Sequence, residues 1–325
     1  MVIMRAALAT GLRQIHCDEA PIPDPVQGKV LVKTKMASIC GSDLHVVYMG
    51  WNAQKFPLPH GYPGHEGVGV VIDGGGTEFS PGDLVLTAPH FLIAKVFAEY
   101  QLIDSKYLLK LPEDTPKAHL LMAQQLGTVI FGCRRLPSLI GQTIVVIGQG
   151  SVGLFHDFML RRMGAQRIIA IEPVPERLAA GRAMGVDEAI DVTGPKASQA
   201  VMDLTNGQGA DTVIEAVGSK DTLNQALEIA TDLGRVAVFG LPPTMDQVPF
   251  NWDAFFRKRL VIHAVHGAQD VPALPDFSLA VDLITRGEID MSPFVTHQFR
   301  ITQIQDAFDL ADSKSDGALK VSLTF

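Results

Sequence analysis

The feature that constrains this chain most is a glycine-rich segment that directly follows a short apolar run. Residues 143–147 read TIVVI, and residues 148–153 read GQGSVG. Apolar residues then recur at helical spacing, so the pattern predicts a strand, a tight turn and a helix. Gly148 allows the turn, Gly150 lets a backbone approach a pyrophosphate, and Gly153 allows close packing of helix on strand. Because the free N–H groups at a helix start favour phosphate, the segment predicts a dinucleotide site.

An acidic residue follows at the expected distance. The next predicted strand, residues 167–171, ends at Glu172, 19 residues after Gly153. A carboxylate there accepts hydrogen bonds from the ribose hydroxyls and repels a 2′-phosphate, which favours NAD over NADP. The alternative is a glycine-rich turn in an unrelated α/β protein, but the strand, the glycines, the helix and the acid all fall in place. We also expect four further residues at the cofactor: Ser151, Val152, Val217 and Gly240.

Strands and helices continue to alternate after this motif. Residues 211–217 and 235–239 read as strands, with a helix around residues 221–231 and Gly234 as its stop. Such alternation is typical of crossover units and a parallel sheet.

The flanking segments have a different pattern. Residues 28–36, 67–72 and 84–87 read as short strands between turns rich in glycine and proline, which indicates a barrel-like or sandwich unit. The last run, residues 319–325, reads as a strand that packs back on this first part. We therefore expect two domains, residues 1–124 with 267–325, and residues 125–266.

Composition excludes several classes of protein. The net charge is −8 and no long basic run occurs, which argues against nucleic-acid binding. No segment approaches about 18 consecutive apolar residues, and the start of the chain lacks the layout of a secretory signal, so we expect no membrane association. The three cysteines, Cys17, Cys40 and Cys133, are odd in number and widely spaced, which favours a reducing cytoplasm over a disulfide framework.

Candidate metal ligands lie in the β-rich part. Residues 40–45 read CGSDLH, and residues 64–67 read GHEG. Thiolate, imidazole and carboxylate are all zinc ligands, and a catalytic zinc needs about three of them with one open position. The alternative is that Cys40 is a buried thiol and His65 a hydrogen-bonded turn residue.

Six segments together carry a family resemblance: ICGSDLH, PGHEGVGVV, PGDLV, FAEY, GQGSVG and GALKVSLTF. They resemble the zinc-containing medium-chain alcohol and polyol dehydrogenases, from roughly residue 4 to residue 325. The resemblance implies an α/β protein, with a GroES-like β-rich catalytic domain and a Rossmann domain built on a doubly wound parallel sheet. It also implies one zinc ion, NAD, and hydride transfer between an alcohol and the cofactor.

The resemblance also implies roles for single residues near the metal. Cys40 and His65 are implied as zinc ligands, with Glu66 as a direct ligand or a group just outside the coordination sphere. Ser42 would pass the substrate proton toward the cofactor ribose, and His45 would form the outer end of that relay. Asp43 would orient the ligand histidine through a hydrogen bond.

For the cofactor, the resemblance implies that Thr128 packs on the nicotinamide. Arg177 would reach the adenosine ribose, and Lys320 would contact the pyrophosphate. The partner molecules implied are a small alcohol or ketone and further copies of the chain, as a homodimer or homotetramer in which the strand at residues 260–264 pairs with its symmetry mate.

The chain departs from the family pattern in two places. Residues 81–85 run almost directly into residues 97–100 with no cysteine between, so the lobe that binds a structural zinc in many members is deleted. Gln124 stands where the family supplies another Cys, Asp or Glu ligand. Either Glu66 takes the third place, or the site binds metal weakly, or zinc has been lost. Two rival functions remain: a zinc-free reductase of enones or quinones, and a non-catalytic NAD-binding protein.

Overall fold

The computed structural model describes residues 2–51, 55–242 and 247–325 of the chain. The chain forms two compact units, Met1–Gly127 with Gly267–Phe325, and Thr128–His266. No sheet is shared between the two units over the described residues.

The continuous unit is built on a parallel six-stranded sheet with the strand order β10-β9-β8-β11-β12-β13. In sequence order this is 3-2-1-4-5-6, the order of the doubly wound dinucleotide-binding fold. The prediction of a doubly wound parallel sheet is therefore confirmed. The strands are β8 (Thr143–Ile147), β9 (Arg167–Ile171), β10 (Glu188–Ile190), β11 (Ala210–Glu215), β12 (Ala230–Val238) and β13 (Val261–Ala264).

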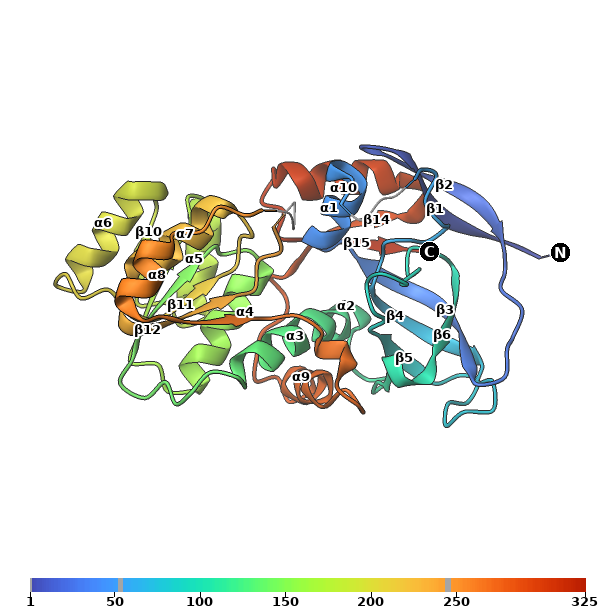
Figure 1. Ribbon diagram of the computed structural model, residues 1–325. Coiled ribbons are helices and arrows are strands. Elements are labelled where there is room, and N and C mark those ends of the chain that lie inside the picture. The colour runs from blue at the N-terminus through green and yellow to red at the C-terminus, as the bar shows by residue number, and fades with distance from the viewer. Residues whose placement is uncertain (1, 52–54, 243–246) are drawn as a thin grey trace. The chain divides into compact units, whose positions relative to one another are not determined.

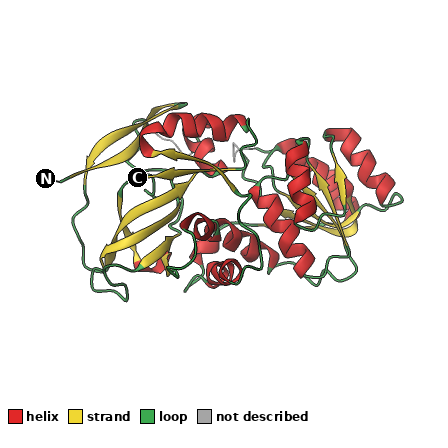
Figure 2. Cartoon of the chain, turned by 180° about the vertical axis from the view of Figure 1, so that it is seen from behind, coloured by secondary structure: helices red, strands yellow, loops and turns green. Residues whose placement is uncertain are grey.

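Helices cover both faces of this sheet because its strands are apolar on both sides. Ile144 and Ile168 face a cluster that also contains residues of α4 and α5, whereas Val145 and Ile169 face residues of α6, α7 and α8. Figures 1 and 2 show the strands lying between these helices. Burial on both faces explains the continuous β-branched runs of the sequence. The helices are α4 (Ser151–Arg162), α5 (Pro175–Ala183), α6 (Gly194–Leu204), α7 (Lys220–Ile229) and α8 (Trp252–Lys258).

The prediction that Gly234 stops a helix is wrong. Helix α7 ends at Ile229, and Gly234 lies inside β12. The register of β12 against β11 shifts in this region, and Leu233 adopts a left-handed conformation with φ 60°. A Cβ on Gly234 would lie 2.7 Å from the carbonyl oxygen of Thr231, so the glycine serves the irregular start of a strand. Strand β11 also ends at Glu215, before the predicted limit at residue 217.

The discontinuous unit holds a two-stranded and a seven-stranded sheet. The larger sheet has the order β14-β15-β3-β4-β5-β7, with β6 also paired to β3. Strand β15 runs antiparallel to β3, so the C-terminal run packs on the first part of the chain as predicted. The strands are β1 (Ile3–Gly11), β2 (Gln14–Pro21), β3 (Lys29–Ser38), β4 (Glu66–Asp73), β5 (Leu84–Thr87), β6 (Tyr100–Asp104), β7 (Leu108–Lys110), β14 (Val295–Arg300) and β15 (Lys320–Thr324).

The helices of this unit bring N-terminal and C-terminal segments into one core. A buried cluster contains Val46 and Val47 of α1 (Gly41–Met49), Phe308 of α10 (Ile304–Ser313), and Leu323 of β15. The other helices are α2 (Lys117–Leu121), α9 (Pro275–Thr285) and the short 3-10 helices η1 (Ser105–Tyr107), η2 (Ala268–Asp270) and η3 (Ile301–Gln303). The division between the units, after Gly127, falls within α3 (Ala123–Cys133). Over the described ranges, every helix is too short or too polar to cross a lipid bilayer.

Candidate active site

The predicted metal ligands gather in the discontinuous unit. Cys40, His65 and Glu66 each offer one ligand atom, and these three atoms lie within 4.8 Å of one another. Cys40 immediately precedes α1, and Glu66 is the first residue of β4. Gly64 has no room for a side chain, because a Cβ would lie 2.6 Å from the ring of Phe97. Zinc bonds to these atoms are about 2.0–2.3 Å long, so one ion can bridge the group with small side-chain rotations.

Asp43 forms hydrogen bonds with two residues of this cluster, His65 and Cys40. The His65 Nδ1–H donates to Asp43 Oδ1 over 3.0 Å, and the Cys40 backbone N–H donates to Asp43 Oδ2 over 2.9 Å. The predicted contact between Asp43 and His65 is therefore present. Because Nδ1 is engaged by a carboxylate, Nε2 is the ring nitrogen that can bind a metal.

The cluster stabilises positive charge. Burial disfavours protonation of the His65 imidazole, but the Asp43 carboxylate and the Cys40 sulfur outweigh it and hold the pKa of His65 well above its usual value. An environment that favours an imidazolium also favours a bound cation, since both add positive charge beside the same carboxylate and sulfur. The donor set and its charge thus fit zinc.

A buried ion pair adjoins the metal cluster. The Lys320 ammonium lies 2.6 Å from Glu66 Oε2, and the Ser38 hydroxyl donates to the same oxygen. Although burial opposes ionisation, Lys320 and His65 keep the pKa of Glu66 below its usual value, so Glu66 is an anion. The family resemblance implies a pyrophosphate contact for Lys320, and nothing in the sequence indicated this pair. No signal in the sequence links the two positions, because they come together only when β15 and β4 both pair with β3.

Two residues, Gln124 and Glu66, are relevant to the identity of the third metal ligand. Gln124 is buried in α3. Across the described residues, Cys40, His65 and Glu66 are the single cluster of Cys, His and acidic side chains with ligand spacing. This favours the first of the three alternatives, in which Glu66 takes the third place.

The two predicted relay residues lie on α1. Ser42 is in its first turn and His45 is three residues later, so the two are neighbours on the helix surface. The Nδ1 atom of His45 is buried and has no hydrogen-bond partner among the described residues. Burial and the positive charge of Lys314 lower the pKa of His45, so its imidazole is neutral near pH 7 and able to accept a proton.

In the other unit, the three motif glycines have distinct steric environments. Gly148 adopts φ 94°, which L side chains rarely tolerate. A Cβ on Gly153 would lie 1.9 Å from the carbonyl oxygen of Gly148, whereas a Cβ on Gly150 would meet no heavy atom within 4 Å. Gly150 caps α4, whose first turn carries Ser151 and Val152. The turn is therefore tight at Gly148 and Gly153 and open at Gly150, where a phosphate would approach.

Glu172 is tied to the same turn. Its Oε2 accepts the Gln149 backbone N–H over 2.8 Å, and its Oε1 accepts the Val174 N–H over 3.1 Å. The side chain is buried at the end of β9. Arg177 follows in the first turn of α5, and Thr128 lies in α3. The contacts predicted for Thr128 and Arg177 with the cofactor stay predictions.

Glu215 organises the neighbouring loop and was missed by the sequence analysis. Its Oε1 accepts the N–H groups of Val217 and Gly218 over 2.9 Å each, and the Thr222 hydroxyl over 2.7 Å. A Cβ on Gly240 would lie 2.5 Å from Glu215 Oε2. One feature could have indicated this role: Glu215 is an acidic residue at the end of a buried strand.

Val217 also lies against the glycine turn. A Cβ on Gly148 would lie 2.7 Å from its Cγ2 atom. The structure therefore gathers the predicted positions Gly148, Val217 and Gly240 at the carboxyl ends of β8, β11 and β12, where this fold binds ligands.

The chain matches two family models. Residues 151–286 match the zinc-binding dehydrogenase model, and residues 26–113 match the alcohol dehydrogenase GroES-like domain model. These matches lie in both units, and the second confirms the expected GroES-like domain.

Individual relatives match over nearly the whole length. The L-threonine 3-dehydrogenase of Pyrococcus horikoshii is 28% identical, over 98% of this chain and 97% of that protein. The corresponding enzyme of Pyrococcus abyssi is 27% identical over the same shares. Alcohol dehydrogenase TADH from Thermus sp. ATN1 superposes with a TM-score of 0.83 at 26% identity, covering 99% of each chain. The chain belongs to the zinc-containing medium-chain alcohol and polyol dehydrogenase family.

Proposed function

We propose that this chain is a zinc- and NAD-dependent oxidoreductase that transfers a hydride between a secondary alcohol or polyol and the nicotinamide. The observation that carries the proposal is the cluster of Cys40, His65 and Glu66 at the start of the helix that bears Ser42 and His45. The relatives named as L-threonine 3-dehydrogenase and alcohol dehydrogenase support an alcohol-type substrate. We assign catalysis to residues 1–124 with 267–325, and NAD binding to residues 125–266.

Different residues of the chain would bind the metal and transfer the proton. Cys40 and His65 would hold zinc, with Asp43 fixing the tautomer of the imidazole. Zinc supplies Lewis acidity, which lowers the pKa of a bound hydroxyl as it lowers that of water to about 7. Ser42 would take up the proton of the alcohol while donating its own hydroxyl proton onward toward the cofactor ribose. Neutral His45, at the outer end of this relay, would accept a proton and release it to solvent.

Glu66 would complete the ligand set. Its Oε2 accepts hydrogen bonds from Ser38 and Lys320, which fix the carboxylate beside Cys40 and His65. This arrangement supports zinc over the zinc-free reductase, which has no use for a thiolate, an imidazole and an anion in one buried cluster.

We also propose NAD as the preferred cofactor. The buried Glu172 carboxylate at the end of β9 would repel a 2′-phosphate, and no Lys or Arg directly follows it. The open face of Gly150 at the start of α4 supports pyrophosphate binding there.

A homodimer or homotetramer in the cytoplasm is the expected state. Strand β13 is the last strand in its sheet, so it can pair with a symmetry mate. Helix α8 beside it exposes Trp252 at 64% and Phe256 at 69%, and a second copy would cover these rings. The free thiols of all three cysteines support a reducing compartment.

The test combines metal analysis with an NADH assay over secondary alcohols, polyols and β-hydroxy amino acids. We expect about one zinc per chain and turnover on part of this panel. Cys40→Ser should abolish turnover and leave NADH binding intact, while Cys17→Ser, the control, should change neither. Silence of the zinc-loaded protein on the whole panel, or an active Cys40→Ser variant, would refute the proposal. Reduction of enones or quinones by metal-free protein would favour the rival reductase.

A further inference from the structure

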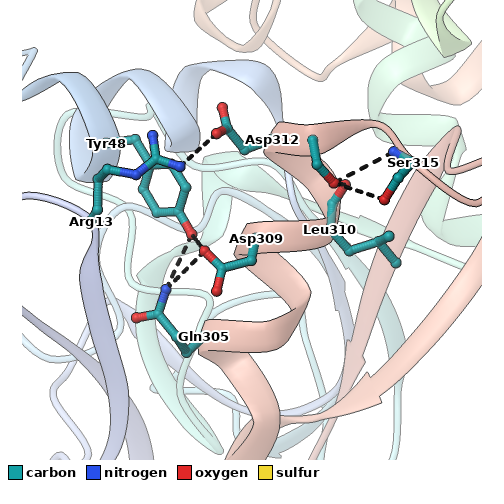
Figure 3. A network of polar contacts seen from close by, with 8 residues as sticks. Arg13, Tyr48, Gln305, Asp309, Leu310, Asp312 and Ser315 are labelled. Atoms are coloured by element: carbon teal, nitrogen blue, oxygen red, sulfur yellow. Dashed lines mark hydrogen bonds and ion pairs between the residues drawn. The ribbon is translucent and has the colours of Figure 1, made fainter.

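A polar network joins the relay helix α1 to helix α10. The Tyr48 hydroxyl, on α1, donates to Asp309 Oδ1 over 2.6 Å. Gln305 Nε2 donates to the same phenol oxygen and to Asp309 Oδ1, each over 3.2 Å. Figure 3 shows these side chains converging from the two helices. Burial and the Asp309 carboxylate raise the pKa of Tyr48, so the phenol stays protonated and remains a donor.

The ring of Tyr48 is held as well as its hydroxyl. The Arg13 guanidinium lies 4.1 Å from the ring centroid and also pairs with Asp312 of α10 over 2.8 Å. The Arg13 backbone N–H donates to the Val47 carbonyl over 2.9 Å. Phe308 packs on the ring with centroids 5.9 Å apart. Tyr48 is therefore fixed by contacts from the β1–β2 turn and from α10.

Helix α1 depends on such contacts. It has nine residues, and an isolated helix of that length is marginal in water. Its orientation is thus set by packing, and Tyr48 is the polar anchor near its C-terminal end. Ser42, His45 and Tyr48 are spaced three residues apart, so a rotation of the helix at Tyr48 displaces both relay residues.

We propose that Tyr48 is a positioning residue for the proton relay, which through Asp309 fixes the rotation of α1 and thereby the placement of His45. This inference rests on the proposed function, because it assumes that His45 carries the substrate proton. A displacement of about 1 Å in a reacting group can cost up to about a hundredfold in rate.

Helix α10 also affects the protonation of His45. Lys314 caps the helix in a left-handed conformation, and its charge acts on His45. The charged side chains that surround this part of α1 in the described chain are Arg13, Asp309, Asp312 and Lys314. The helix that anchors Tyr48 therefore also helps to keep the relay histidine neutral.

The test is a double-mutant cycle with Tyr48→Phe and Asp309→Ala on the zinc-loaded enzyme. Each change should lower kcat for alcohol oxidation about tenfold with KM for NAD unchanged, and the double variant should be no slower than either single one. Rising concentrations of a non-coordinating tertiary-amine buffer base should restore kcat, because the base replaces the misplaced relay. Hydrogen–deuterium exchange of residues 41–49 should become faster in both variants. Asp306→Ala, an exposed position on the same helix, serves as the control and should match the wild type.

Two outcomes would overturn the inference. One is wild-type kcat in Tyr48→Phe; the other is a loss that buffer base does not restore. His45→Gln separates this inference from the proposed function: it should be slow and restored by buffer base. If His45→Gln turns over at the normal rate while Cys40→Ser is inactive, the relay and the role of Tyr48 fall but the zinc-dependent function stands.

Discussion

The ammonium of Lys320 lies 2.6 Å from a carboxylate oxygen of Glu66, and the two side chains are only 3% and 2% exposed. A pair of opposite charges this deep is costly to break, because either partner alone leaves an uncompensated charge away from water. The pair also neutralises one of the charges beside Cys40 and His65. It therefore links the stability of this unit to the charge of the candidate metal cluster.

We expect Lys320→Met to lower the free energy of unfolding by about 3–5 kcal/mol, because it strands the Glu66 carboxylate. Urea denaturation monitored by circular dichroism measures this. The added substitution Glu66→Gln should recover part of the loss. Lys110→Met provides the control, since the Lys110 side chain of the Lys110–Asp83 pair is 52% exposed and the pair should contribute little. Equal effects of the two lysine substitutions would contradict a special role for the buried pair.

A second expectation concerns Asp157, which is fully buried in α4. Burial, only partly offset by Gln149, raises the pKa of Asp157 well above its usual value. The folded state then binds the proton more tightly than the unfolded state does. Stability from this group is therefore complete below the ordinary carboxyl pKa and declines as pH rises toward the folded pKa.

Asp157→Leu removes this cost, so we expect the variant to be more stable than the wild type by about 1–3 kcal/mol at pH 8. The difference should shrink toward pH 4. Denaturation curves at both pH values test the sign, with the exposed Asp191→Asn as a reference. A difference that does not change with pH would show that packing, rather than proton binding, causes it.

The motif glycines should respond differently to the same substitution. Gly153→Ala places a methyl group 1.9 Å from the Gly148 carbonyl oxygen, so it should destabilise the fold by about 1–3 kcal/mol or more. Gly150→Ala meets open space and should fold normally but bind NADH at least about tenfold more weakly, because the methyl group stands where the pyrophosphate would approach. Thermal unfolding and NADH fluorescence titration separate the two effects. Unchanged NADH affinity in Gly150→Ala would place the phosphates elsewhere.

Glu172→Ala should reduce the preference for NADH over NADPH by about tenfold or more, since it removes the charge that repels a 2′-phosphate. Both affinities must be measured, because the substitution also releases the Gln149 N–H and can weaken the two cofactors equally. Glu172→Gln controls for the loss of charge alone. A retained preference for NADH in both variants would mean that another group discriminates between the cofactors.

Local patterns in the sequence correctly predicted the strands whose limits depend mainly on their own residues. Strands β5, β8 and β9 begin and end at the predicted residues, because each is a continuous apolar run buried in a sheet. The end of α7 was mispredicted because the start of β12 depends on its register against β11, a partner distant in sequence.

In the candidate site, too, the sequence indicates what lies within short motifs and does not indicate contacts between distant segments. Two short motifs contain Cys40, His65 and Glu66 and marked them as candidate ligands, and the structure brings the three side chains together. The metal role itself was implied by the family resemblance and not by the spacing. The contacts from Lys320 to Glu66 and from Tyr48 to Asp309 join residues far apart in the chain. Only the return of α10 and β15 to the first part of the chain creates them, and no local pattern carries that information.

The discontinuous unit also imposes an order on events during synthesis. Glu66 is made early, whereas the strand that supplies its counter-ion emerges only after the whole of Thr128–His266. Until then Glu66 lacks the lysine that pairs with it in the folded unit. The buried ion pair can therefore form only after β15 has been made and has paired with β3.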